Sequence, residues 1–301
     1  MLNKVINCYY NKSSSGIGDF LRGCCHLFSI LNEQNINFEM SFKNHDLSKH
    51  LRTKCSVDVN LDDIYDTEKD NKENCNENNY FDNMEANLLK VLNSDKEEVT
   101  IFSNYSNHIV NIENYFLPDD CKQFMKDNLI FSDEIDQEFD NLDLKDYIVA
   151  HFRLGDRECC QHIAKSELSR YNLNTALFDI HYEKLAGKIV TAYLENKKTV
   201  VVMSDSNKFK EYIKKNIVDR TDYDIRIIHE KSQHTSDNPG FIEALDIDRE
   251  IKQSNMYYVA LDMKIISKTD QVQSYSVYPW GSGFSFWLAR IFDIPISQNS
   301  V

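Results

Sequence analysis

The chain has 301 residues, 42% hydrophobic and 12% aromatic residues, and a formal net charge of −14 at pH 7. This length suits one large domain or two domains of about 150 residues each, and the apolar content argues against global disorder. A strongly acidic chain repels phosphate backbones, so we expect no nucleic acid among its partners, and any anionic ligand requires a local concentration of positive groups.

The opening residues MLNKVINCYY contain no apolar run long enough for a signal peptide or a membrane span, and no later segment reaches a spanning length. The eight cysteines comprise two adjacent pairs and scattered single residues, unlike a disulfide framework. We therefore expect a reduced, cytoplasmic protein without stable membrane insertion, whose cysteines are small core residues.

Apolar and polar runs alternate along the first half in a way that predicts strands followed by helices. The predicted strands are 4–10, 36–42 and 99–104, and the predicted helices are 20–34, 84–93 and 119–141. A loop over 11–19 contains two glycines before the first helix. Residues 58–83 are rich in asparagine and acidic residues, which predicts a polar surface insert rather than core.

The second half repeats the alternation more clearly. The predicted strands are 147–152, 198–206, 224–230 and 270–276, and the predicted helices are 175–195, 208–217, 241–266 and 281–292. Strands and helices at this spacing are typical of βαβ units with parallel sheets. We therefore predict a two-domain α/β protein, with an N-terminal domain over 1–145 and a C-terminal domain over 146–301.

Three polar clusters follow predicted strands of the second half, where open parallel sheets bind ligands. They are His151–Asp156, Ser204–Ser206 and Ser274–Ser285. In the third, WGSGFSFW has two glycines and two serines directly before an apolar helix, and backbone N–H groups at a helix start form an anion site. Arg153 could supply a planar, permanent positive charge that matches a phosphate.

Each cluster also has a purely structural interpretation. Arg153 and Asp156 could pair with each other, the SDS of 204–206 could cap the following helix, and GSGFS could be a turn and a cap. Three such clusters at neighbouring strand ends favour one shared ligand over three unrelated contacts.

Four segments resemble the fucosyltransferases that use GDP-fucose. YIVAHFRLGD is similar to their H-x-R-x-G-D segment, and VVVMSDS resembles their next strand, which also ends in Ser-Asp. VALDMKIISKTDQVQSYS followed by GSGFSFWLA resembles their third motif, and SSSGIGDFLRG resembles their N-terminal glycine loop. The resemblance covers the second half in order and only the glycine loop in the first. It implies a GT-B fold, in which two Rossmann-like domains with parallel sheets face a cleft and the C-terminal one binds the donor nucleotide.

The resemblance also implies roles for particular residues. Arg153 would contact the diphosphate, oriented by Asp156, and Asp262 would face the guanine, which presents N–H donors to a carboxylate. Ser282, Gly283, Phe284 and Ser285 would surround the phosphates. The full expected donor site is His151, Arg153, Asp156, Asp205, Asp262, Ser282, Gly283, Phe284, Ser285, Gly16 and Gly18.

The resemblance implies inversion at the anomeric carbon by an acceptor hydroxyl in a single displacement. No D-x-D follows an apolar strand, and the DID of 246–248 lies in a predicted helix, so we expect no metal; Arg153 and the helix start would stabilise the leaving diphosphate. Asp19 is the candidate general base, with an alternative role as a helix N-cap. Asp19 stands where the family usually has asparagine, and Leu154 replaces a frequent second arginine, which leaves the acceptor open.

The function predicted from the sequence is therefore metal-independent transfer of fucose from GDP-fucose to a glycan hydroxyl, with no cofactor besides the donor substrate. Two alternatives stay open. One is a transferase of the same fold that uses another nucleotide sugar, and the other is a catalytically silent domain that binds a nucleotide or glycan.

Overall fold

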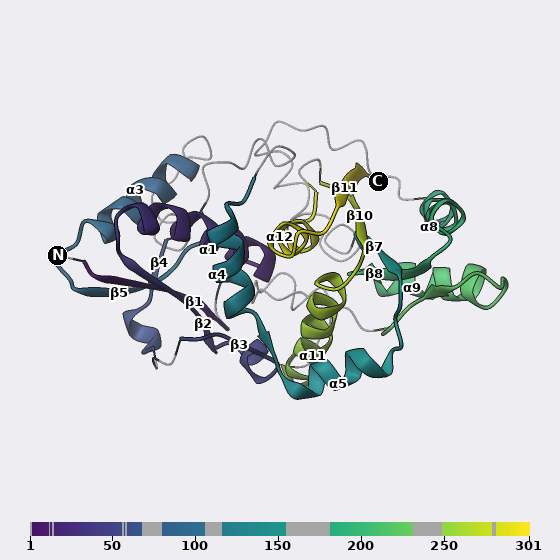
Figure 1. Cartoon of the computed structure of the whole chain (residues 1–301), viewed down its shortest axis with the longest axis horizontal. Helices are drawn as coiled ribbons and strands as arrows, with labels where there is room; N and C mark the ends of the chain where they lie inside the picture. Colours follow the sequence, from purple (N-terminus) through teal and green to yellow (C-terminus); the bar gives the residue numbers. More distant parts are fainter. Residues whose placement is uncertain are drawn as a thin grey trace. The chain divides into compact units, whose positions relative to one another are not determined.

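The computed structural model describes residues 2–11, 13, 15–55, 57, 59–67, 80–105, 116–154, 181–230, 249–278 and 281–301, with backbone only for 80–83 and 249–255. Within these ranges, residues up to Ser132 form one compact unit and residues from Asp133 onward form a second. Each unit contains a parallel sheet with helices packed on it (Figure 1). The predicted α/β class with parallel sheets is confirmed.

The first unit is built on a four-stranded sheet of order β2-β1-β5-β4, in which every neighbouring pair is parallel. A two-stranded antiparallel ribbon, β3 with β6, stands beside it. The strands are β1 (Lys4–Tyr10), β2 (Asn37–Asn44), β3 (Leu51–Arg52), β4 (Tyr65–Asp66), β5 (Glu98–Phe102) and β6 (Ile130–Phe131). The helices are α1 (Ile17–Glu33), α3 (Tyr80–Leu92) and α4 (Asp119–Asn128), with short 3-10 turns η1 (Asp46–Lys49) and η2 (Leu61–Asp63).

Aromatic rings fill the core of the first unit. The Phe20 ring of α1 lies 5.0 Å from Tyr9, 5.5 Å from Phe42 and 6.4 Å from Phe102, measured between ring centroids. Such pairs contribute beyond their buried area because ring edges and faces attract. Among the described cysteines, Cys8, Cys24, Cys25, Cys55 and Cys121 are all free and buried, which confirms their predicted role as core residues.

Helix α1 approaches the end of β5 unusually closely, and this contact requires glycine. A Cβ on Gly23 would lie 1.9 Å from the carbonyl oxygen of Ser103. The Asn7 side chain of β1 closes the same region, donating to the Ser103 oxygen at 3.0 Å and accepting from the Ser103 N–H at 2.9 Å. These contacts fix the second turn of α1 and the middle of β1 against the residue that follows β5.

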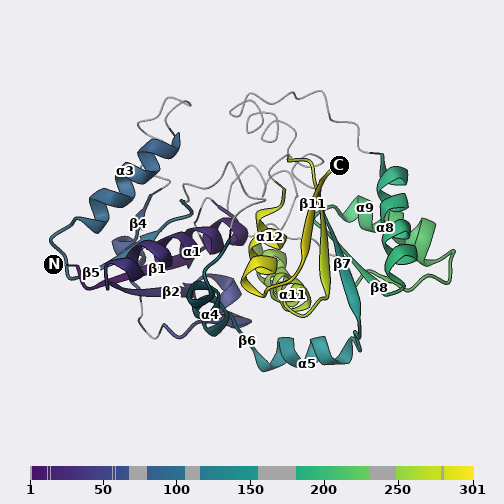
Figure 2. The same cartoon turned by 45° about the horizontal axis from the view of Figure 1, so that its top comes forward.

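The second unit has a five-stranded parallel sheet of order β11-β10-β7-β8-β9. Figures 1 and 2 show α8 and α9 on one face and α11 and α12 on the other. The strands are β7 (Tyr147–Arg153), β8 (Thr199–Ser204), β9 (Ile225–Arg226), β10 (Gln271–Ser276) and β11 (Ile296–Ser300). The helices are α5 (Asp133–Asn141), α8 (Tyr182–Asn196), α9 (Asn207–Ile213), which continues as the π-helix η5 (Lys214–Val218), α11 (Arg249–Ile266) and α12 (Gly283–Ile291).

The central strand β7 is buried along almost its whole length, as its uninterrupted apolar run predicts. Phe152 stacks on Tyr275 of β10 with centroids 4.7 Å apart and contacts Phe209 of α9 at 4.8 Å. These contacts join three elements directly beneath the polar end of β7.

Most predicted strands and helices are confirmed, with informative differences. Helix α1 begins at Ile17 because Gly16 is its N-cap, and the predicted helix 119–141 is interrupted after Asn128, where Leu129 leaves the helical region at φ −107° and ψ 73°. The strand predicted at 224–230 is only two residues long, and β3, β4, β6 and β11 were not predicted. The prediction that 58–83 is a surface insert rather than core is wrong for β4, which joins the first sheet and is followed by the buried Thr67. Parts of two predicted helices, 175–180 and 241–248, lie outside the described residues.

The chain passes from the first unit to the second after Ser132, whereas the sequence predicts this boundary after residue 145. Helix α5 belongs with the second unit because it packs on α11, where Lys264 pairs with Asp136 at 2.6 Å.

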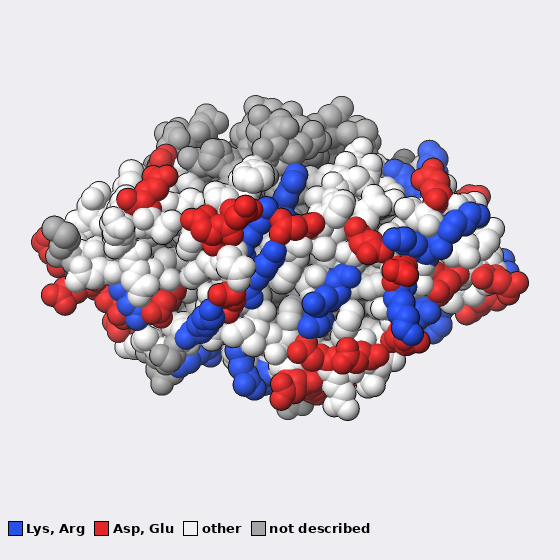
Figure 3. Space-filling view, viewed as in Figure 1, with Lys and Arg blue, Asp and Glu red and all other residues white. Residues whose placement is uncertain are grey.

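Acidic and basic side chains are interspersed on the face drawn in Figure 3. Exposed pairs such as Lys54–Asp127, at 2.7 Å, are screened by solvent and are weak evidence for stability. None of the helices in the described part of the chain combines the length and apolar composition needed to cross a membrane.

Candidate functional site

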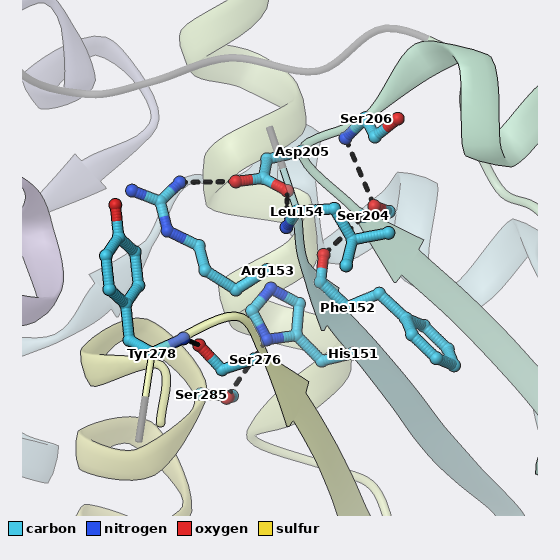
Figure 4. Close-up of polar contacts among 10 residues, drawn as sticks. All are labelled: His151, Phe152, Arg153, Leu154, Ser204, Asp205, Ser206, Ser276, Tyr278 and Ser285. Carbon is cyan, nitrogen blue, oxygen red and sulfur yellow. Dashed lines mark hydrogen bonds and ion pairs between the residues drawn. The ribbon is translucent and has the colours of Figure 1, made fainter. Parts of the chain in front are cut away.

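An ion pair lies at the carboxyl ends of β7 and β8 in the second sheet. Strand pairing sets Phe152 opposite Ser204, so the next residues, Arg153 and Asp205, lie opposite each other. Arg153 Nη1 donates to Asp205 Oδ2 at 2.5 Å, and the Leu154 N–H donates to Asp205 Oδ1 at 2.6 Å (Figure 4). The Arg153 and Asp205 side chains are 21% and 15% exposed. A guanidinium is thus held in a fixed direction while part of it remains accessible.

The serines that flank Asp205 have a structural role. Ser204 Oγ donates to the Phe152 oxygen at 2.9 Å and accepts from the Ser206 N–H at 3.1 Å. Ser206 is the N-cap of α9, and its Oγ accepts from the Phe209 N–H at 3.1 Å. The capping interpretation is therefore confirmed for Ser206, while the intervening Asp205 turns toward Arg153.

A buried chain of polar groups lies behind Arg153. His151 Nδ1 lies 3.0 Å from Ser285 Oγ, which lies 3.1 Å from Ser274 Oγ, so β7, α12 and β10 are joined. Burial lowers the pKa of His151 to about 4, against the opposing effect of Asp205 and Asp262. The imidazole is therefore neutral at pH 7, and because Ser285 is fully buried its hydroxyl serves this chain of contacts.

The start of α12 lies beside this chain. Ser282 is the N-cap, and the first helical hydrogen bond runs from the Phe286 N–H to the Ser282 oxygen at 3.0 Å. The N–H groups of residues 283–285 precede that bond and point out of the helix start. Gly281, at φ +79°, leads into the helix, and a Cβ there would lie 2.5 Å from the Gln298 side-chain amide of β11. The Phe284 ring lies 5.8 Å from the His151 ring.

Asp262 has a partner that the sequence did not suggest. Its Oδ1 lies 2.9 Å from His229 Nε2, just after β9, and Lys210 Nζ of α9 donates to the His229 carbonyl oxygen at 3.2 Å. Lys210 is buried, which lowers its pKa to about 8. The sequence places His229 near the end of the strand predicted at 224–230, whereas nothing in the helix KFKEYIKKNI distinguishes Lys210 from its neighbours.

The glycine loop residues belong to the first unit. Gly16 is the N-cap of α1, and Gly18 and Asp19 lie in its first turn. Asp19 pairs with Arg22 at 3.2 Å with its side chain 41% exposed, and Arg22 Nε donates to the Asn104 oxygen at 3.0 Å. Asp19 is therefore not the N-cap, and its carboxylate instead complements the positive end of the helix.

The structure thus brings together His151, Arg153, Asp205, Phe284 and Ser285 in one unit, with Asp262 on the neighbouring helix. Asp156 lies outside the described residues; Asp205 is an acid that orients Arg153. Over the ranges that the structure describes, no three His, Cys, Asp or Glu side chains are arranged to hold a metal ion. A fixed guanidinium beside a helix start can bind a doubly charged oxyanion such as a diphosphate.

No protein-family model matches the chain, and no curated protein sequence matches it. Solved structures of the α-1,6-fucosyltransferase NodZ do match. NodZ soaked with GDP-fucose has a TM-score of 0.53 at 11% identity, covering 98% of this chain and 94% of that one. NodZ co-crystallised with GDP has 0.54 at 12%, covering 96% and 92%, and NodZ from Bradyrhizobium has 0.53 at 12%, with the same coverage. This chain has the GT-B fold of these fucosyltransferases, as the resemblance of its motifs predicts.

Proposed function

We propose that this chain is an inverting, metal-independent glycosyltransferase that transfers fucose from GDP-fucose to a hydroxyl of a glycan. The observation that carries the proposal is the Arg153 guanidinium, which Asp205 holds at the carboxyl end of the central strand beside the start of α12. The donor would bind the second unit, and the acceptor would bind the first.

Arg153 would hold the diphosphate in the ground state and stabilise it more strongly as the leaving group departs. A guanidinium has five N–H donors, so it can bind Asp205 and a phosphate at once. A charge pair near 4 Å contributes about 4 kcal/mol at an effective dielectric of ~20, a ceiling of about a thousandfold in rate. Only the part of this interaction that grows in the transition state accelerates the reaction.

The start of α12 would supply the second contact with the phosphates. The N–H groups of Gly283 and Phe284 lie within its first turn, where backbone donors and the helix dipole favour negative charge. Ser282 would be the hydroxyl at the phosphates, and Ser285 would act indirectly, since its hydroxyl is buried against His151. Charge stabilisation by such fixed groups requires no metal ion.

Asp262 would recognise the base, because a carboxylate can accept both the N1–H and the 2-amino hydrogens of guanine. Asp19 would accept the proton of the attacking acceptor hydroxyl, with Gly16 and Gly18 allowing close approach at the start of α1. The five cysteines that the structure describes are free and buried, which supports a reducing compartment, and we assign the enzyme to the cytoplasm.

Calorimetric titration with GDP, UDP, ADP and CMP, with and without magnesium, tests this proposal. We expect selective GDP binding that magnesium does not change, followed by turnover of GDP-fucose in the presence of a glycan acceptor. Selective UDP binding would instead support a transferase with another nucleotide sugar. GDP binding without any transfer would support a silent binding domain, and no nucleotide binding would overturn the donor site.

A further inference from the structure

The segment that follows β9 is fixed by two helices at once. Lys210 Nζ of α9 donates to the His229 carbonyl oxygen at 3.2 Å, and Lys214, the first residue of η5, pairs with Glu230. From α11, Asp262 contacts the His229 ring nitrogen at 2.9 Å. Residues 229–230 therefore bridge the two helices on opposite faces of the second sheet.

The His229 ring has contacts that fix both its position and its rotation. Its face lies on Tyr258, with centroids 4.7 Å apart and an interplanar angle of 30°. Tyr258 and Asp262 are four residues apart on α11, so one face of the helix both supports the ring and receives its Nε2 contact. The His229 and Asp262 side chains are 12% and 20% exposed, so both are largely shielded while Asp262 keeps some access.

This cluster is electrostatically joined to the Arg153 site. Asp262 and Asp205 both act on the pKa of Lys210 and both act on that of His151, in each case opposing the effect of burial. Asp262 therefore lies within range of the groups that would hold the diphosphate. Its carboxylate direction matters at this site, because a base-recognising carboxylate must present its oxygens to two N–H groups in one plane.

We infer that His229 is a positioning residue for nucleobase selection: its Nε2 contact sets the direction of the Asp262 carboxylate, and Lys210 fixes His229 in turn through the backbone. The inference rests on the proposed function, in which Asp262 faces guanine. A carboxylate has about four acceptor positions on two oxygens, so Oδ1 can receive His229 and still take part in binding the base. A carboxylate already fixed loses less freedom when the ligand binds.

A purely structural role for His229 predicts a different experimental result. If His229 only stabilised the unit, its loss would weaken every nucleotide equally and would lower the melting temperature in proportion. If His229 directs Asp262, its loss would selectively reduce the preference for a base with a 2-amino group. Inosine diphosphate keeps the N1–H and lacks that amino group, so it separates the two roles.

The experiment compares calorimetric affinities for GDP and inosine diphosphate in the full chain and in two variants. His229→Phe keeps a ring on Tyr258 and removes the nitrogen that contacts Asp262, and His229→Gln restores an N–H donor on a flexible side chain. The control His181→Phe changes an exposed histidine at the start of α8 whose side chain makes no capping hydrogen bond. The melting temperature of each protein is measured in parallel.

We expect the unmodified chain to prefer GDP by about tenfold or more, the ratio that one hydrogen bond to a charged group supports. His229→Phe should reduce this ratio to below about threefold, with the affinity for inosine diphosphate changing less than about twofold. His229→Gln should recover most of the preference, and His181→Phe should retain it.

Equal weakening of both nucleotides in His229→Phe, or an unchanged ratio, would overturn the positioning role while leaving GDP selection by the unmodified chain intact. An unmodified chain that binds GDP and inosine diphosphate equally would overturn this inference and the assignment of Asp262 to the base, whereas an unmodified chain that binds neither nucleotide would overturn the proposed donor site. The two failures are therefore distinguished by the unmodified protein alone.

Discussion

The two parallel sheets present different chemistry at their carboxyl ends. In the second unit, Arg153 and Asp205 form a partly exposed ion pair directly after β7 and β8. In the first unit, the corresponding ends of β1 and β4 carry Tyr10 and Asp66, both buried and joined by a hydrogen bond of 2.5 Å. The first pair leaves a guanidinium partly exposed, whereas the second pair is buried.

The remaining groups follow the same division. At the end of β5, Asn104 Nδ2 donates to Ser15 Oγ at 2.6 Å, and the Tyr9 ring stacks on His45 at 4.4 Å. All four side chains are buried, and none of them carries a permanent charge. The same βαβ topology therefore carries an ion pair at one set of strand ends and neutral, buried side chains at the other. In the proposed function, this difference in charge separates the donor side from the acceptor side.

Removing the charge at the end of β7 is the strongest test of this difference. We expect Arg153→Ala to reduce transfer from GDP-fucose by up to about a thousandfold, the ceiling set by one charge pair of about 4 kcal/mol. Steady-state kinetics and GDP calorimetry measure the effect. Arg226→Ala, which removes a half-exposed arginine paired with Asp224 in the same unit, is the control and should leave both unchanged. Unchanged GDP binding in Arg153→Ala would refute the phosphate assignment.

A backbone contact tests the first unit independently. Gly23→Ala would place a Cβ 1.9 Å from the Ser103 oxygen, and we expect the free energy of unfolding of this unit to fall by about 3 kcal/mol. Gly187→Ala is the matched control, because no atom lies within 4 Å of its Cβ, and this exposed helical site should gain about 0.5–1 kcal/mol. Urea denaturation measures both. Equal stability of the two variants would contradict the close packing of α1 on β5.

The buried histidine of the second unit should make stability depend on pH. The folded-state pKa of His151, about 4, lies below the ordinary value of 6.5, so its contribution is fully present above pH 6.5 and is lost as the pH falls toward 4. This linkage predicts a loss of about 2 kcal/mol between pH 7 and pH 5. Urea melts at both pH values measure it. His151→Gln, which cannot titrate, should show a smaller loss, and an identical loss would contradict the assignment.

The smallest expected effect is that of chelation. If Arg153 and the start of α12 stabilise the leaving diphosphate, EDTA should leave the rate of transfer unchanged, and added magnesium should not restore or raise it. Initial rates with and without EDTA test this. A loss of activity that magnesium reverses would show that a metal ion also stabilises the leaving diphosphate.

The sequence predicts the second unit better than the first for physical reasons. The run from Tyr147 to Phe152 is apolar because β7 is covered on both faces, and its polar end is therefore conspicuous. In contrast, Asp66 ends a two-residue strand that follows a polar segment. A strand of two residues is too short to show an alternation of apolar and polar residues in the sequence. Its pairing with Tyr10 arises from the sheet order, which brings together residues 56 positions apart.

The candidate site shows the same limit. The strand-end pattern identifies His151, Arg153 and Asp205, because parallel strands bring their carboxyl ends to one edge. It does not identify Lys210, which is one of the two lysines on α9 and differs from Lys208 in its burial against the His229 segment. The burial of a single long side chain depends on how helices and strands pack together, so local sequence patterns do not predict it.

The contact between Gly281 and Gln298 has a consequence for how this protein can diverge. Strand β11 carries none of the residues proposed to touch the donor, yet Gln298 occupies the space that a side chain at position 281 would need. The two positions should therefore change together during evolution. A relative with a side chain at 281 would need both a smaller residue at 298 and a different turn. The loop that leads into α12 therefore limits which residues can replace Gln298 in β11.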